Sequence, residues 1–114
     1  MTHFNDYAEE TDRTAIYPDA NEGNFEALAY VGLGLSGEAG EIANQIKKII
    51  RDDDGEVTPE RLAYITKEIG DVLWYTARLC RELELDMDEI AENNIEKLLN
   101  RQKRGVLQGS GDNR

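Results

Sequence analysis

The stretch that decides the fold is GEAGE at residues 37–41, together with KEIGD at residues 67–71. Each stretch places two carboxylates three positions apart, so on a helix each pair shares one face and can converge on a single ion. Six other acidic pairs in the chain have the same spacing, so the residues around these two pairs must decide their role. The four acids of interest are Glu38, Glu41, Glu68 and Asp71.

Helical patterning extends outward from both stretches. Asn21 or Asn24 can cap a helix that continues to about residue 51, and Thr58 followed by Pro59 can begin another that continues to about residue 83. The first of these helices contains four glycines within nine positions, each of which costs about 1 kcal/mol in a helix interior. We therefore expect either a break near residues 32–34 or the close approach of another backbone or a ligand. The glycines are Gly32, Gly34, Gly37 and Gly40.

The remaining segments also favour helices and turns. A short helix is expected over residues 4–14, and the acidic run at residues 52–55 is typical of a turn. A fourth helix opens at Asp86, where Glu89 follows at capping-box spacing, and ends at Gly105. The sequence thus predicts an all-α bundle of about four helices in one domain over residues 1–105, with a glycine-rich tail at 106–114.

Composition limits the function. The chain has 114 residues, a net charge of -11 and a pI near 4.4, which argues against binding to nucleic acid polymers or anionic membranes through the general surface field. The single cysteine, Cys80, excludes an internal disulfide framework. No apolar run reaches membrane-spanning length and the polar start lacks a signal peptide, so we expect a cytoplasmic protein. At this size, association with another copy often completes the core.

The two acidic pairs differ from the other six in their position relative to the apolar faces. Projected at about 100° per residue, Glu38 and Glu41 lie roughly 70° and 130° from the centre of the apolar stripe of their helix. Glu68 and Asp71 have matching offsets on the same side of theirs. Antiparallel packing could then bring four carboxylates together, where a divalent cation would relieve their repulsion. The expected stripes are Leu35, Ile42, Ile46 and Ile49, and Ile65, Ile69, Val72, Leu79 and Leu83.

The fourth helix carries a polar and basic stripe. Asn94, Lys97 and Arg101 recur at spacings of three and four beside an apolar line, and Arg104 follows about one turn later. Such a cluster can bind phosphate oxygens, and we expect it to face the two acidic pairs, although Arg104 is equally explained by the helix dipole. On the third helix Tyr75 lies one turn beyond Asp71, where its ring could stack on a base or simply pack.

In this order, these residues resemble the MazG-type all-α nucleoside triphosphate pyrophosphohydrolases. That superfamily is marked by Glu-x-x-Glu followed by Glu-x-x-Asp, and the resemblance covers roughly residues 25–114, including Asn-x-x-Lys-x-x-x-Arg and the tail. It implies a helical bundle completed as a homodimer or homotetramer. It also implies hydrolysis of nucleoside triphosphates, often deoxynucleotides, to the monophosphate and pyrophosphate, with Mg²⁺ as cofactor and Mn²⁺ as a substitute.

The resemblance assigns a role to each candidate residue. Glu38, Glu41, Glu68 and Asp71 would bind metal, with Glu41 as the candidate general base. Lys97, Arg101 and Arg104 would contact phosphates, while Asn94 and Tyr75 would hold the sugar or base. Two alternatives remain open: activity on phosphoribosyl-ATP, which another member of the superfamily hydrolyses, and a non-catalytic helical module that binds nucleotides.

Overall fold

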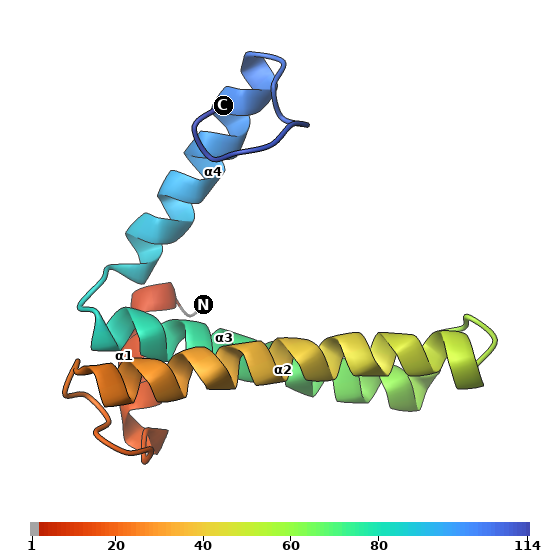
Figure 1. Ribbon diagram of the computed structural model, residues 1–114, viewed down its shortest axis with the longest axis horizontal. Coiled ribbons are helices and arrows are strands. Elements are labelled where there is room, and N and C mark those ends of the chain that lie inside the picture. Colours follow the sequence, from red (N-terminus) through yellow and green to blue (C-terminus); the bar gives the residue numbers. More distant parts are fainter. Residues whose placement is uncertain (1–2) are drawn as a thin grey trace.

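The computed structural model describes residues 3–114, and in this range it contains helices and no strand. The all-α prediction is confirmed, and the bounds agree with the expected ones to within a few residues. None of the helices in this range is long and apolar enough to cross a membrane. The elements are α1 (Phe4–Thr11), the 3₁₀ turn η1 (Asp12–Thr14), α2 (Phe25–Asp52), α3 (Pro59–Glu82) and α4 (Met87–Lys103) (Figure 1).

The three long helices begin where the capping residues predict. The side chains of Asn24, Thr58 and Asp86 each accept a hydrogen bond from the backbone N–H three residues later. Each cap satisfies one of the donors that the first turn of a helix leaves without an intrahelical partner. Helix α2 continues through its four glycines, so the break near residues 32–34 does not occur.

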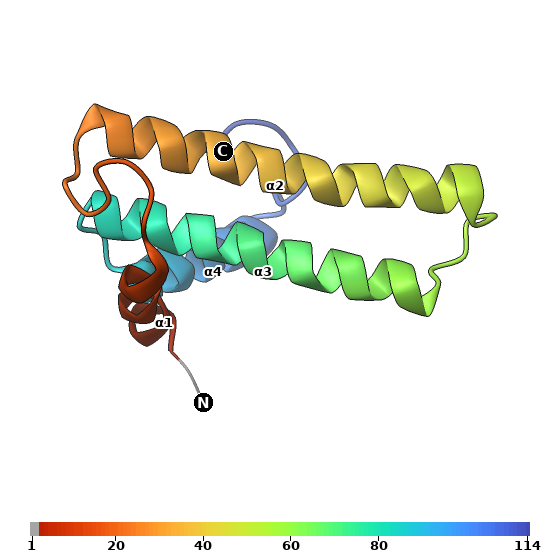
Figure 2. The ribbon, with the colours of Figure 1, turned by 90° about the horizontal axis from the view of Figure 1, so that it is seen from below.

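Helices α2 and α3 form a long antiparallel hairpin, which both views show side by side (Figures 1 and 2). At the loop end, the guanidinium of Arg61 donates to Asp53 at 3.1 Å and to Gln45 at 2.8 Å. Nearer the middle, the ring of Tyr75 lies directly on Gly34, where a Cβ atom would overlap it. The close approach expected at the glycines is therefore found at Gly34, which fixes how α2 and α3 face each other.

The opposite end of the hairpin is closed by a buried polar network around Arg78. Its guanidinium is fully buried and donates to Tyr17, Thr11 and Asn21. Glu82, also buried, accepts from the hydroxyl of Tyr17 and from the backbone N–H of Asn21 and of Gly23. These bonds tie the segment before α2 to the last turns of α3.

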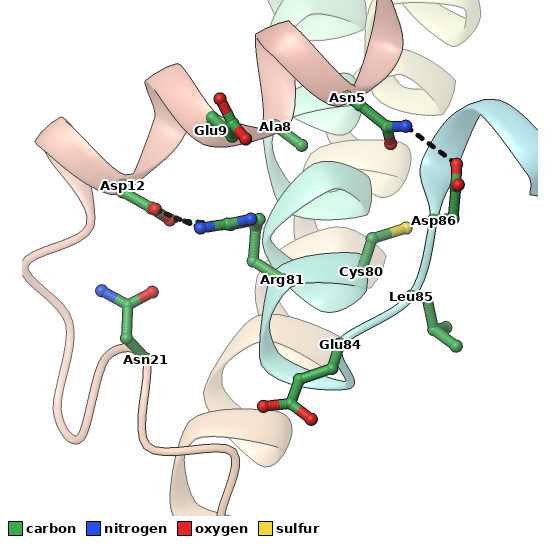
Figure 3. A pocket seen from close by; sticks show the side chains of 10 residues that line it. All are labelled: Asn5, Ala8, Glu9, Asp12, Asn21, Cys80, Arg81, Glu84, Leu85 and Asp86. Carbon is green, nitrogen blue, oxygen red and sulfur yellow. Dashed lines mark hydrogen bonds and ion pairs between the residues drawn. The ribbon is translucent and has the colours of Figure 1, made fainter.

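The start of α4 is anchored to α1. The side chain of Asn5 donates to Asp86 at 2.8 Å and accepts from the backbone N–H of Met87 at 2.9 Å. Figure 3 shows this bond at the edge of a cavity of about 730 Å³ between α1 and the end of α3, which the Arg81–Asp12 ion pair also lines. The contact fixes only the first turn of α4.

Beyond that turn, α4 diverges from the hairpin (Figure 1), and residues 92–100 are all exposed. Its apolar line is therefore open to solvent, with Ile95 58% exposed. The expected core stripes of the hairpin are only partly covered as well, since Ile49 is buried while Ile69 is 56% exposed. Within the single chain the outer residues of these stripes remain exposed, because α1 and the hairpin alone supply too few neighbouring surfaces to cover them.

Candidate functional site

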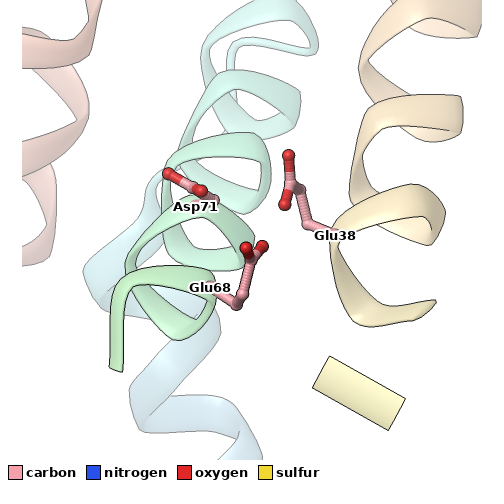
Figure 4. Close-up of side chains that lie close together, drawn as sticks. All are labelled: Glu38, Glu68 and Asp71. Atoms are coloured by element: carbon pink, nitrogen blue, oxygen red, sulfur yellow. The ribbon is translucent and has the colours of Figure 1, made fainter. Parts of the chain in front are cut away.

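Three of the four predicted carboxylates meet between the helices of the hairpin. Figure 4 shows Glu38 reaching from α2 toward Glu68 and Asp71 on α3. One carboxylate oxygen from each lies within 4.8 Å of the other two. The spacing of three residues places Glu68 and Asp71 on one face of α3, as predicted, and antiparallel packing brings Glu38 opposite them.

Glu41 does not belong to this group. It lies one turn further along α2 and is exposed, whereas Glu38 and Glu68 are partly buried. Its negative charge nevertheless contributes to raising the pKa of Glu38. The convergence of four carboxylates is therefore observed for three, with the fourth beside them.

The three acids lie close enough to disturb one another. A hydrogen bond with Glu68, followed by burial and by the charges of Glu68, Asp71 and Glu41, raises the pKa of Glu38 to about 7. One oxygen of Glu68, Oε2, is buried without a hydrogen-bond partner. A buried carboxylate oxygen that lacks a partner is unfavourable, so the cluster is electrostatically incomplete as it stands.

The chemistry of this donor set fits a hard divalent cation. All three ligands are carboxylate oxygens, which Mg²⁺ and Mn²⁺ favour over nitrogen or sulfur. A cation would give the orphan Oε2 of Glu68 a partner and offset the repulsion that raises the pKa of Glu38. Among residues 3–114, this is the one group of three or more acidic, histidine or cysteine side chains close enough to share an ion.

Two aromatic side chains, Tyr75 and Trp74, lie next to the acids. Tyr75 is one turn from Asp71 on α3 and rests on Gly34, which is one turn from Glu38 on α2. Burial raises the pKa of Tyr75, and its neighbours Tyr30, Glu38 and Asp71 raise it further. Trp74 packs edge-on against Tyr75 with ring centroids 5.1 Å apart. Tyr75 thus borders the cluster as predicted. The glycine-rich run predicted a close approach on this helix, but not that Tyr75 is the residue that packs on Gly34.

The basic stripe does not reach the acids within one chain. Asn94 and Lys97 lie on the exposed part of α4, which packs mainly on α1 and points away from the hairpin (Figure 1). Arg101 and Arg104 lie further out on the same helix and bond to the C-terminal tail. The expectation that this stripe faces the acidic pairs is wrong for the single chain. The cause is the sharp turn between α3 and α4, in which Glu84 adopts a positive φ of 55°.

This fold and this acid cluster define an all-α protein with a candidate divalent-cation site between two antiparallel helices. The chain belongs to the family of the MazG nucleotide pyrophosphohydrolase domain, whose model matches residues 28–106. The match spans both acidic pairs, Tyr75 and the basic stripe, and the resemblance drawn from the sequence is confirmed.

A relative supports the same grouping. The Gene 37 protein of Mycobacterium phage L5 is 48% identical over 113 residues, which cover 98% of this chain and 99% of that protein. Its name states no activity. No solved structure matches the chain.

Proposed function

We propose that the protein hydrolyses nucleoside triphosphates, including deoxynucleotides, to the monophosphate and pyrophosphate in a Mg²⁺-dependent reaction. The observation that carries the proposal is the incomplete carboxylate cluster of Glu38, Glu68 and Asp71, which lies inside the segment that matches the MazG domain. The raised pKa of Glu38 and the orphan oxygen of Glu68 are the features that a bound cation would resolve.

In this proposal the residues of the hairpin have different roles. Glu38, Glu68 and Asp71 would hold Mg²⁺, or Mn²⁺ in its place, and the ion would supply positive charge against the triphosphate and act as a Lewis acid. Glu41 is exposed beside the cluster, where its carboxylate is free to act as a general base or to complete the metal shell. Tyr75 offers a ring and a hydroxyl next to the acids for the base or sugar.

The basic residues imply that a second copy completes the site. Lys97 and Arg101 suit phosphate, yet their helix points away from the acids of its own chain (Figure 1). The same helix exposes Ile95 and Leu99, and the hairpin exposes Ile69 and Leu33. We infer that α4 of one chain packs on the hairpin of another, which would cover these apolar side chains and bring opposite charges together. Asn94 and Arg104 would approach the substrate in the same way.

The primary test is a panel of ordinary and deoxynucleoside triphosphates, together with phosphoribosyl-ATP, assayed for pyrophosphate release with Mg²⁺. We expect release from at least one nucleoside triphosphate and its loss in Glu68→Ala, with that variant still folded. Glu56→Ala, which removes an exposed acid from the loop between α2 and α3, is the matched control and should remain active. Full activity in Glu68→Ala would contradict the assignment. Nucleotide binding without release by the wild type would favour a non-catalytic module.

The shared site has its own test. Glu68→Ala and Arg101→Ala chains are each expected to be inactive alone, because one lacks a metal ligand and the other a phosphate contact. Mixed under conditions that exchange subunits, they would form some sites with both intact residues and recover part of the activity. A mixture that stays inactive although native mass spectrometry shows mixed dimers would place the whole site within one chain.

A further inference from the structure

The C-terminal tail is folded back on α4 rather than extended from it (Figure 1). Gly105 makes the turn with a positive φ of 76°, a conformation that glycine adopts without strain. Arg114 then closes the loop by donating to the carbonyl oxygens of Val106 at 2.9 Å and of Leu107 at 2.8 Å. The tail is thus an ordered loop whose position is set by its own last residue.

This loop makes hydrogen bonds and ion pairs with the basic residues that are proposed to bind phosphate. Arg101 is only 4% exposed, although it follows nine exposed positions on α4, because the tail covers it. Its Nη2 donates to the main-chain oxygen of Asp112 at 2.6 Å and lies 3.3 Å from the carboxylate of the same residue. Lys97 Nζ reaches that carboxylate at 3.4 Å. Arg104 donates to the carbonyl oxygen of Arg114 at 2.7 Å.

A carboxylate and a phosphate group present the same kind of anionic acceptor to Arg and Lys, so they compete for the same N–H groups. The ion pairs that the Asp112 carboxylate makes with Lys97 and Arg101 are weak. The side chain of Asp112 is 85% exposed and its ion-pair distances are long, which is typical of pairs that contribute little to stability.

We propose that Asp112 is an affinity-setting residue, whose carboxylate competes with the triphosphate for Lys97 and Arg101 and must leave before the phosphates bind. The proposal rests on the proposed function in one respect, that these two cations bind phosphate. In this arrangement the tail neutralises part of the charge of Lys97 and Arg101 when no nucleotide is present, and an incoming polyanion displaces it.

The experiment measures binding of inorganic tripolyphosphate by calorimetry in a buffer with EDTA, so that neither metal nor turnover contributes. Asp112→Asn should bind about two- to fivefold more tightly than the wild type, the range that removal of an exposed ion pair allows. A chain that ends at Gly105 should bind at least as tightly as Asp112→Asn, since it also uncovers Arg101. Combining Asp112→Asn with Lys97→Ala should shrink the gain, because the freed cation is then missing.

Glu96→Gln is the matched control. It removes one negative charge next to Lys97 on the same helix, where Glu96 is exposed and makes no ion pair among residues 3–114. We expect little change in its affinity for tripolyphosphate. An equal gain in Glu96→Gln would reduce the effect to general charge and overturn the proposal. Unchanged or weaker binding by Asp112→Asn would also overturn it, the latter by making the tail part of the phosphate site.

The two proposals can fail separately. If the wild type releases no pyrophosphate from any nucleotide but Asp112→Asn still tightens tripolyphosphate binding, the proposed hydrolysis fails and the competition stands. If the wild type is active and Asp112→Asn binds tripolyphosphate no better, the competition fails alone.

Discussion

Two groups of ionisable side chains lie along the same helix hairpin, and they are treated in opposite ways. At the end opposite the loop, Arg78 and Glu82 are buried but surrounded by partners, including Tyr17 and two backbone N–H groups. In the middle, Glu38, Glu68 and Asp71 face one another, and one oxygen of Glu68 has no hydrogen-bond partner.

The pKa shifts express this difference. Burial acts to raise the pKa of Glu82, but hydrogen bonds from Tyr17, Asn21 and Gly23 outweigh it, and the pKa is lowered. For Glu38, the hydrogen bond with Glu68, burial and nearby charges all act in one direction and raise it. The charges around Arg78 are satisfied within the chain, whereas the three carboxylates of the acid cluster repel one another, which is the pattern expected of the proposed cation site.

The largest expected effect breaks the satisfied group. Arg78→Ala would leave the buried carboxylate of Glu82 without its cation and Tyr17, Thr11 and Asn21 without a donor. Removal of one member of a buried charged pair is expected to destabilise the protein by about 3–5 kcal/mol. Urea denaturation followed by circular dichroism measures the loss.

Arg81→Ala is the matched comparison. Arg81 lies one turn later on α3 and binds the same Asp12 as Arg78, but its side chain is 39% exposed. We expect a loss of less than about 1 kcal/mol, as for exposed ion pairs. Equal losses in the two variants would mean that burial does not distinguish these arginines.

A smaller effect is expected at the boundary between the two regions, where Tyr75 rests on Gly34. In Gly34→Ala the new Cβ would overlap the Tyr75 ring, so α2 and α3 must separate or the ring must move, at a cost of about 1–3 kcal/mol. Gly37→Ala, with open space around its Cβ, should instead stabilise the helix by about 0.5–1 kcal/mol. Thermal unfolding separates the two. If both substitutions stabilise, the contact between Tyr75 and Gly34 does not hold the hairpin.

These features show what can be predicted from the sequence. The starts of α2 and α3 follow from local chemistry at Asn24 and Thr58, which accept the bonds that the caps require. The shared face of Glu68 and Asp71 follows from helical periodicity alone. Signals that depend only on neighbours within a few residues were therefore sufficient for the helices and for most of the acid cluster.

Features that depend on how the helices are placed relative to one another could not be predicted. The pairing of Gly34 with Tyr75 needs the alignment of α2 against α3, and the direction of α4 depends on the backbone at Glu84. Arg78 appears in the sequence as one more charge in a charged chain, and only the segment of residues 11–23 packed over it reveals that it is buried. No local pattern encodes these contacts between distant segments.

The smallest expected effect sharpens the contrast through pH. The pKa of Glu38 is about 7 in the folded, metal-free protein and 4.5 ordinarily, so its contribution to stability is complete below pH 4.5. As the pH rises from 4.5 to 7, Glu38 ionises in the unfolded chain but stays largely protonated in the folded one, and stability falls. After allowance for the partial exposure of Glu38, we expect a loss of about 1 kcal/mol.

Asp12 and Glu82 have lowered pKa values, so they contribute with the opposite sign and in a lower range. Their contribution is present above their ordinary pKa values and is lost only as the pH falls through the folded ones. The interval from pH 5 to 7 therefore reports on Glu38 alone among these three. Thermal unfolding in EDTA should show a falling midpoint across this interval in the wild type and a flat one in Glu38→Gln. Added Mg²⁺ should remove the fall in the wild type, because the ion stabilises the ionised cluster that the proton otherwise relieves. A slope that persists in Glu38→Gln would assign the titration to another group and leave the acid cluster without the repulsion that separates it from the Arg78 network.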